Sequence, residues 1–179
     1  MEPTDARRLV PCFDEPEFKA IWKIKVIHPI GTSAVSNGIE TKIAVKTENP
    51  DWVVTSFIES PPMSSYLLAL AITDFDYNEG NTSRGTRFRI WSRREALNQT
   101  SYALSAGISA LEFYEDYYNI SFPLKKQGYQ LNWGMITYRE KYLLFDENLY
   151  APFQKASVAL VVAHELAHQV HFFPKLAVI

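Results

Sequence analysis

The chain has 179 residues, and its content of 47% hydrophobic and 14% aromatic residues can fill a packed core, which argues against disorder. A formal net charge of −2, with only short basic clusters, argues against a nucleic-acid partner, which would need a basic face. The single cysteine, Cys12, excludes an intrachain disulfide, and its apolar neighbours predict a buried, unreactive thiol. No apolar run approaches the ~20 residues of a membrane span, and the polar first residues are not a secretory signal.

The first part of the chain is predicted to form β-strands separated by turns rich in Pro, Gly, Asn and Asp. Alternation of apolar with polar or basic residues, the period of a half-buried strand, favours this assignment. A more continuous apolar run at 66–72 predicts a more buried strand. The predicted strands cover residues 22–26, 42–46, 52–57, 66–72 and 87–91.

The second part is predicted to be mostly helical. From about residue 94 to residue 118 the apolar residues fall at helical spacing, and we expect Pro123 to stop this helix. A short aromatic and β-branched segment at 133–139 predicts a strand. A second helix is expected from Pro152 to about residue 173, before Pro174. The change from predicted strands to mostly predicted helix places a domain boundary near residue 85.

Three N-x-S/T sequons begin at Asn81, Asn98 and Asn119. Such sequons are acceptors for N-glycosylation in secreted proteins. Three of them in about forty residues indicate an ancestry in the secretory pathway.

The strongest chemical signal is the sequence His164-Glu165-Leu166-Ala167-His168. On a helix, positions i and i+4 share one face, so both imidazoles can reach one zinc ion at ~2 Å. Glu165 can stand beside a zinc-bound water and accept its proton, as the general base of a hydrolase. The alternative is a structural role, in which the two histidines make polar contacts on a buried helix.

Several blocks of the chain resemble the zinc aminopeptidases of peptidase family M1, which are gluzincins, and they occur in that family's order. The resemblance covers nearly all of residues 1–169, through the blocks 2–8, 11–16, 62–69, 102–104, 113–115, 122–124 and 132–140. It implies an α+β fold, in which a partial antiparallel β-domain (1–85) precedes the first part of a thermolysin-like zincin catalytic domain (86–179). It also implies one zinc site held by His164 and His168, with Glu165 as general base.

By the same resemblance, the implied reaction is hydrolysis of the N-terminal peptide bond of peptide substrates. Family members are often membrane-anchored and dimeric, which together with the sequons implies a plasma-membrane or extracellular location.

The family's exopeptidase motif G-A-M-E-N is only partly kept. The matching stretch is Gly128-Tyr129-Gln130-Leu131-Asn132, so Gly128 and Asn132 remain candidates for substrate binding. Leu131 stands where the family's Glu grips the α-amine of the substrate. An apolar side chain cannot replace that charge-assisted hydrogen bond, which is worth ~1.5–3 kcal/mol.

The zinc site also departs from the family pattern. The family's third ligand is a Glu about 18 residues after the second histidine, whereas 11 residues follow His168 here and none of them is Glu or Asp. The family's oxyanion-stabilising tyrosine lies further downstream. His171 is a candidate substitute ligand, but three histidines along one straight helix converge poorly on a tetrahedral ion. We therefore expect a site without its third protein ligand and an impaired or inactive chain.

Other polar residues have open interpretations. Tyr138 and Glu140 either border the substrate cleft, or Glu140 pairs with its neighbours Arg139 or Lys141. His28 is interpreted as structural, and Asp5, Asp14 and Glu15 as turn and salt-bridge residues. The alternative to an aminopeptidase is a non-catalytic truncated homologue that binds peptide or a partner chain, or a fragment without a role of its own.

Overall fold

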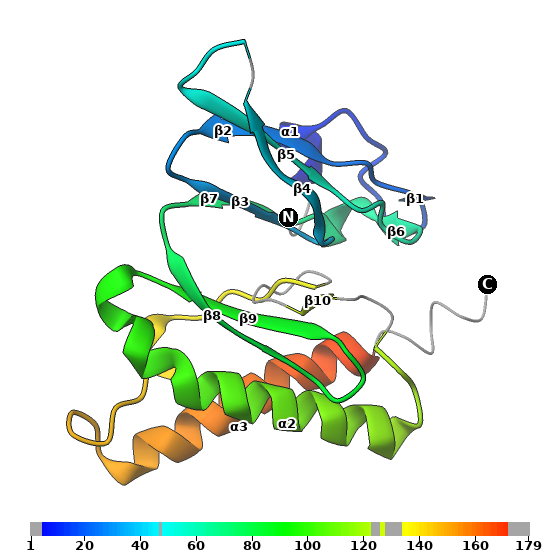
Figure 1. The fold of residues 1–179 in the computed structure, drawn as a ribbon. Coiled ribbons are helices and arrows are strands. Elements are labelled where there is room, and N and C mark those ends of the chain that lie inside the picture. Colours follow the sequence, from blue (N-terminus) through cyan, green and yellow to red (C-terminus); the bar gives the residue numbers. More distant parts are fainter. Residues whose placement is uncertain (1–4, 47, 123–125, 128–133, 172–179) are drawn as a thin grey trace. The chain divides into compact units, whose positions relative to one another are not determined.

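A computed structural model describes residues 5–46, 48–122, 126–127 and 134–171 of the chain (Figure 1). The chain divides into two compact units, one formed by residues 1–74 with 132–135 and the other by residues 75–131 with 136–179. The predicted α+β fold is confirmed, because helices combine with sheets that are antiparallel in all but one strand pair. The boundary expected near residue 85 stays a prediction, and the change of unit described here lies between Asp74 and Phe75.

The first unit is built mainly from short strands. Its largest sheet has the order β2-β5-β4, and two strand pairs, β1-β6 and β3-β7, accompany it. The elements are α1 (Ala6–Leu9), β1 (Lys19–Ala20), β2 (Lys25–Pro29), β3 (Ser33–Ser36), β4 (Glu40–Lys46), β5 (Trp52–Phe57), β6 (Met63–Ser64), the 3₁₀ turn η1 (Ser65–Leu67) and β7 (Leu70–Thr73).

The strand expected at 52–57 is confirmed as β5, and the one at 42–46 lies within β4. The strand expected at 22–26 is displaced, since β2 begins only at Lys25. Before that point, the backbone N–H of Trp22 bonds to the Ser60 hydroxyl and its indole Nε1 to the Met63 carbonyl. Trp22 is therefore held by a loop and not by a ladder of strand hydrogen bonds.

His28 on β2 is structural, as expected. Its buried ring lies between two hydroxyls, with Nδ1 2.9 Å from Thr32 Oγ1 and Nε2 2.9 Å from Thr55 Oγ1. Because Thr32 Oγ1 already donates to the Pro29 carbonyl, it accepts from Nδ1–H, and Nε2 then accepts from Thr55. Both ring nitrogens are satisfied within the sheet, which leaves His28 no role as a ligand.

Asp14 is also structural, in agreement with the prediction. Its buried carboxylate accepts hydrogen bonds from Ser65 Oγ at 2.6 Å, from the Arg7 backbone N–H at 3.1 Å and from Arg7 Nε at 3.2 Å. The Ser65 hydrogen bond, assisted by Arg7, holds the pKa of the Asp14 carboxyl below its usual range. The carboxylate thus joins α1 to the segment that follows β6.

The continuous strand predicted over 66–72 is wrong in its first half. Residues 65–67 form η1, and β7 begins only at Leu70. The cause is Asn37, whose buried amide donates to the Leu67 carbonyl and accepts from the Ala69 backbone N–H, both at 2.8 Å. A side chain therefore supplies the hydrogen bonds that a strand partner would otherwise make.

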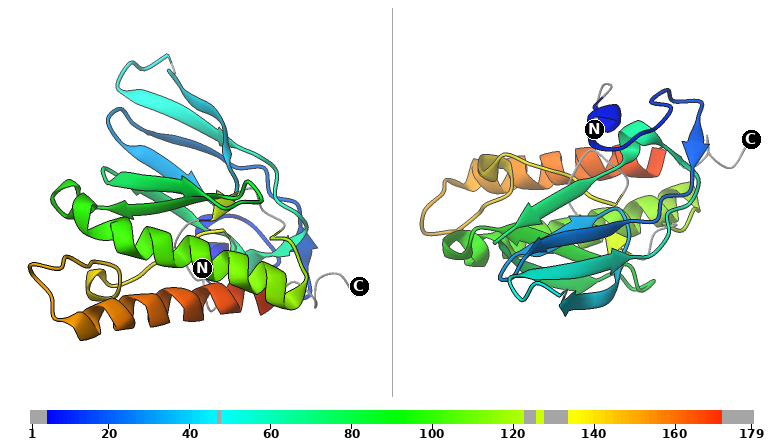
Figure 2. Two further views of the ribbon diagram at one scale, coloured as in Figure 1. Left: turned by 60° about the horizontal axis from the view of Figure 1, so that its bottom comes forward. Right: turned by 90° about the horizontal axis from the view of Figure 1, so that it is seen from above.

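The second unit places a small sheet beside two long helices (Figures 1 and 2). In the sheet order β10-β9-β8, β8 and β9 are antiparallel and β10 is parallel to β9. The elements are β8 (Asp76–Asn81), β9 (Arg87–Ser92), the 3₁₀ segment η2 (Arg94–Thr100), α2 (Ser101–Tyr118), β10 (Lys126–Gln127), the 3₁₀ turn η3 (Glu140–Tyr142) and α3 (Pro152–His171).

Helix α2 packs against both the sheet and α3. Its buried residues Ala103, Gly107, Leu111 and Glu115 repeat every four residues and form one stripe. The β8–β9 hairpin approaches this helix so closely that a Cβ at Gly80 would lie 2.7 Å from Ile108 Cδ1. Glycine at this position therefore permits the contact between sheet and helix.

The prediction that Pro123 stops this helix is wrong. Helix α2 ends at Tyr118, because Asn119 adopts a left-handed backbone with φ 53°. The backbone N–H of Asn119 bonds to the Asp116 carbonyl and that of Ile120 to the Glu115 carbonyl, the two bonds of a Schellman motif. Asparagine is among the few residues other than glycine that tolerate this conformation.

Helix α3 begins at Pro152 as predicted. Its residues Val158, Val162 and Leu166 are completely buried and repeat every four residues. Tyr114 of α2 donates a hydrogen bond of 3.1 Å from its hydroxyl to the Ala163 carbonyl. Helices α2 and α3 consequently lie side by side, as both views in Figure 2 show.

The strand predicted at 133–139 is wrong for the residues that the structure describes there. Residues 134–139 contain only an isolated bridge at Met135. Gly134 has φ 80°, and Met135 and Ile136 are both buried instead of alternating. The segment is an irregular loop leading into η3.

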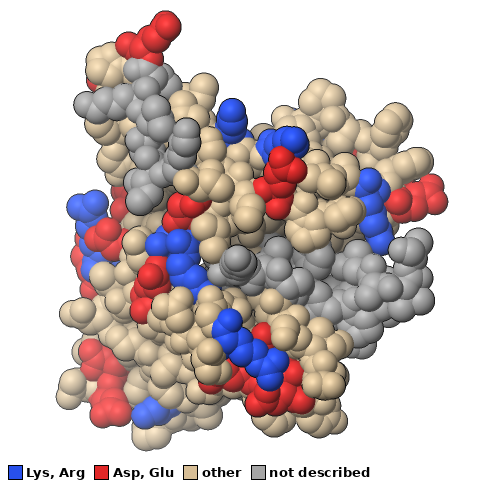
Figure 3. All heavy atoms as spheres, turned by 45° about the vertical axis from the view of Figure 1, so that its right-hand side comes forward, with Lys and Arg blue, Asp and Glu red and all other residues tan. Residues whose placement is uncertain are grey.

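Charged side chains are mixed in sign on the face shown in Figure 3. Among the described residues visible there, no basic patch gathers, in agreement with the net charge of −2.

Candidate metal site on helix α3

His164 and His168 lie one turn apart on the exposed face of α3. Their Nε2 atoms are 3.0 Å apart, and their rings are perpendicular with centroids separated by 4.6 Å. Two nitrogens that each lie about 2.0–2.1 Å from a tetrahedral zinc ion are about 3.3 Å apart. A small rotation of either ring provides that spacing, so the donor pair fits one ion of this kind.

The packing of α3 explains why the histidines face outward. Leu166 is 0% exposed and lies between them in sequence, on the stripe that packs inward. Leu160, one turn before His164 on the same exposed face, is 71% exposed. The four-residue repeat that fills the core therefore fixes the direction in which the histidines project.

Glu165 lies at the border between these two faces. Its side chain is half-buried, and its Oε2 atom is buried without a hydrogen-bond partner among the described residues. Leaving a carboxylate oxygen in that state costs free energy unless a further group satisfies it. An orphaned carboxylate next to two convergent imidazoles is the donor set expected of a metal site that also handles a proton.

Tyr138, from the loop before η3, lies near this carboxylate. Burial raises the pKa of the Tyr138 hydroxyl, and the negative charge of Glu165 raises it further. Sequence reasoning placed Tyr138 only in a segment bordering a cleft and did not connect it with Glu165. The two residues are 27 positions apart in sequence, so no local pattern could have paired them.

Glu140 makes an ion pair, but not with a neighbour in sequence. Arg93 Nε donates to Glu140 Oε1 at 2.8 Å, and this contact raises the pKa of Arg93. Its predicted partners Arg139 and Lys141 are therefore replaced by a residue that directly follows β9.

A third ligand is not found in the described part of the chain. No group of three or more His, Cys, Asp or Glu side chains gathers there in a way that could hold a metal. His171 ends α3, but its side chain is not described. The predicted substrate residues Gly128 and Asn132, together with Leu131, lie outside the described residues.

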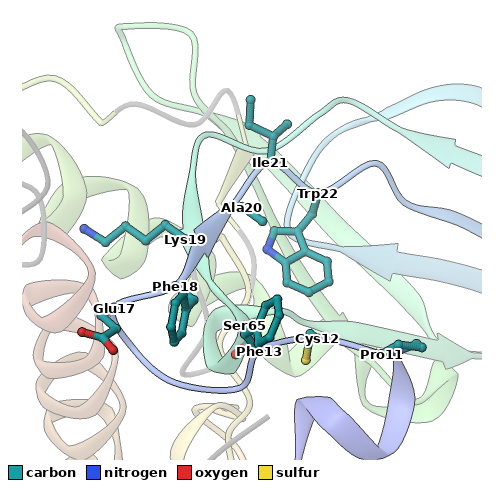
Figure 4. A pocket seen from close by; sticks show the side chains of 10 residues that line it. All are labelled: Pro11, Cys12, Phe13, Glu17, Phe18, Lys19, Ala20, Ile21, Trp22 and Ser65. Atoms are coloured by element: carbon teal, nitrogen blue, oxygen red, sulfur yellow. The ribbon is translucent and has the colours of Figure 1, made fainter.

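A separate hollow of about 530 Å³ lies in the first unit (Figure 4). Phe13, Phe18 and Trp22 line it together with Cys12, which is half-buried and not buried as predicted. None of the residues predicted to carry chemistry lines this hollow.

Comparison with known proteins matches both halves of the chain to one family. Residues 1–67 match the peptidase M1 N-terminal domain, and residues 102–171 match the peptidase family M1 domain. Among curated relatives, aminopeptidase N of Haemonchus contortus is 54% identical over 178 residues. Aminopeptidase N of Homo sapiens is 41% identical over 185 residues, and glutamyl aminopeptidase of Bitis rhinoceros is 40% identical over 179 residues.

Each of these alignments covers 94% of this chain but only 18–19% of the relative. The chain thus spans about a fifth of the length of the curated relatives that it matches. In the part of the chain that the structure describes, no helix combines the length and apolarity needed to cross a bilayer.

Both domain matches and the names of the relatives point to one class of proteins, the peptidases of family M1. The chain belongs to peptidase family M1, whose aminopeptidases are generally zinc-dependent.

Proposed function

We propose that this chain carries the zinc-binding helix and the general base of an aminopeptidase that hydrolyses the N-terminal peptide bond of peptides. The observation that carries the proposal is the 3.0 Å separation of His164 Nε2 and His168 Nε2, with the orphaned Glu165 carboxylate between them in sequence. The family match and the names of the relatives support the same reaction class.

In this proposal His164 and His168 hold zinc through Nε2. When bound, zinc supplies Lewis acidity toward water and toward a substrate carbonyl. Glu165 accepts a proton from the attacking water at its carboxylate, and later returns that proton to the leaving amine. Its Oε2 atom is available for this role because no described residue donates to it.

On the substrate side, we propose Gly128 and Asn132 as peptide contacts. Leu131 provides no carboxylate for the α-amine of the substrate. Loss of that charge-assisted hydrogen bond removes the anchor that fixes the peptide against the metal. This loss supports an impaired or inactive catalyst.

Leu131, in place of the family's amine-binding Glu, also favours a second candidate, a non-catalytic homologue that binds peptide or a partner chain. Domain limits of 1–85 and 86–179, a plasma-membrane or extracellular location and a dimeric, membrane-anchored parent enzyme remain proposals based on the family.

Zinc titration of the purified chain tests the site directly. We expect binding that His164→Ala and His168→Ala each abolish and that Glu165→Gln retains, because Glu165 is not a ligand. His171→Ala is the matched control, since it removes a histidine of the same helix outside the pair. Equal loss of zinc in His171→Ala and His168→Ala would contradict the assignment of the ligand pair.

A further inference from the structure

The last two turns of α2 carry a group of exposed aromatic side chains. Phe113, Tyr117 and Tyr118 are 60%, 71% and 42% exposed. The Phe113 and Tyr117 rings are stacked, with centroids 5.8 Å apart and an interplanar angle of 20°, and Tyr118 meets Tyr117 edge-on at 5.0 Å. We call these three residues the α2 aromatic patch. An exposed apolar patch of this kind offers a surface against which another group can pack.

The patch leads directly into the sequon Asn119-Ile120-Ser121. Asn119 and Ser121 are both exposed, and Tyr117 precedes Asn119 by two positions. The Schellman motif at the end of α2 wraps the chain back onto the last helical turn, which keeps Asn119 beside the turn that bears Tyr117 and Tyr118. No hydrogen bond to the Asn119 side chain is found among the described residues.

Polar contacts hold this helix end in place. Glu112 Oε1 accepts from the Ser83 backbone N–H at 2.6 Å, and Glu115 Oε1 accepts from the Phe122 N–H at 2.7 Å. Arg84 pairs with Asp116 and donates to the Ser121 hydroxyl at 3.4 Å. These contacts hold the backbone that carries the α2 aromatic patch and Asn119.

We propose that Asn119 carries an N-linked oligosaccharide whose first N-acetylglucosamine covers the α2 aromatic patch. The axial C–H groups on one face of a pyranose ring are weakly positive, and they are attracted to the electron-rich face of an aromatic ring. In this proposal the group that covers the patch is a sugar attached covalently two residues after Tyr117. The proposal does not depend on the zinc chemistry proposed above.

The modification requires a lipid-pyrophosphate-linked oligosaccharide as the co-substrate of a secretory-pathway transferase. The Asn119 side-chain nitrogen forms a bond to C1 of the N-acetylglucosamine that is linked to the lipid pyrophosphate, and loses one proton. The bond from C1 to the pyrophosphate oxygen breaks, and the lipid pyrophosphate leaves with the bonding electrons. No oxidation or reduction takes place.

The other two sequons lack this aromatic neighbour and act as internal controls. The residues two positions before Asn81 and Asn98 are Glu79 and Ala96. In the Asn98 sequon, the Thr100 hydroxyl is buried and bonded to the Leu97 carbonyl and the Asn78 amide, both at 2.7 Å. A glycan at either position would lack an aromatic side chain at the spacing of Tyr117 from Asn119.

The test expresses the full chain behind a cleavable secretion signal in cells that make only high-mannose glycans. Asn81→Gln and Asn98→Gln leave Asn119 as the remaining sequon. Mass spectrometry of the peptide that contains Asn119 should find the oligosaccharide, and Ser121→Ala should remove it while Ser121→Thr keeps it. Unmodified Asn119 in secreted, folded chain would overturn the proposal.

Treatment with two different glycosidases then isolates the contribution of the first sugar to stability. One leaves a single N-acetylglucosamine on Asn119, and the other removes the whole glycan and leaves Asp, for which Asn119→Asp is the charge-matched control. We expect the form with one sugar to unfold about 2–4 °C above the fully deglycosylated form, the shift that a contact of roughly one aromatic pair gives a chain of this size.

Tyr117→Ala should abolish this difference without loss of the glycan, because it removes the ring and not the sequon. Phe113→Ala provides a second substitution of an exposed ring in the patch, and it should reduce the difference. In the NMR spectrum, the acetamido methyl of the first sugar should show an upfield ring-current shift that Tyr117→Ala removes. Equal unfolding temperatures with and without the first sugar, or a difference that persists in Tyr117→Ala, would overturn the proposed contact.

Discussion

Replacing Leu166 with alanine tests whether the helix that carries the histidine pair is held by the packing described here. Leu166 is 0% exposed, in the stripe of α3 that faces α2. A buried Leu→Ala change costs about 2–5 kcal/mol, through lost burial and the cavity that remains. Alanine and leucine have nearly equal helix propensities, so almost all of the effect reports packing.

Leu160→Ala is the matched control, because it makes the same change on the same helix at a position that is 71% exposed. It should change the free energy of unfolding by no more than about 0.5 kcal/mol. If Leu166→Ala lowers the free energy of unfolding by about 3 kcal/mol and the urea m-value is about 2 kcal/mol per molar, the urea midpoint of this variant falls by roughly 1.5 M. Urea unfolding monitored by circular dichroism measures both variants, and similar midpoints would refute the assignment of inward and outward faces on α3.

Three further results are expected. After dialysis against a chelator the chain should retain clearly less than one zinc per chain, because two imidazoles are fewer than the three or four protein ligands of ordinary sites; one full equivalent would contradict this. Amino-acid amides should be hydrolysed slowly or not at all with added zinc, and turnover at ordinary aminopeptidase rates that Glu165→Gln abolishes would show that the isolated chain is a competent enzyme. Because the folded-state pKa of Asp14 is lowered, its contribution to stability is present above the usual Asp pKa of about 3.9 and is lost as the pH falls through the lower folded value. Asp14→Asn should therefore flatten the loss of stability on acidification, whereas the exposed Glu15→Gln should leave it unchanged, and equal acid profiles for the two variants would refute the role of Asp14.

Features fixed by local sequence were predictable. The spacing of His164 and His168 places both rings on one helical face whatever surrounds the helix, and the structure has their nitrogens 3.0 Å apart. The strand at 52–57 follows from its alternation alone. Pro152 begins a helix for reasons internal to that turn.

Features fixed by distant partners were not predictable. Asn37, some thirty residues earlier in the chain, supplies the hydrogen bonds that prevent a strand through Leu67. Arg93 pairs with Glu140 across 47 positions, in place of the adjacent Arg139 or Lys141. The helical pattern ended at residue 118, where α2 does end, but the cause was misassigned, because an asparagine in the left-handed region stops the helix before Pro123.

The half-buried position of Glu165 favours the proposed hydrolytic role of α3 over a purely structural role for its histidines. Two histidines that capped polar contacts would need no carboxylate beside them, and a buried carboxylate oxygen without a hydrogen bond would only reduce stability. Here Glu165 lies between the stripe that ends in Leu166 and the exposed face that carries both imidazoles, with Oε2 buried and unsatisfied by the described residues. Natural proteins accept such local costs mainly where a site must bind something else. The unsatisfied Oε2 atom of Glu165 is therefore more consistent with a general base that acts on a metal-bound water than with a helix selected for stability alone.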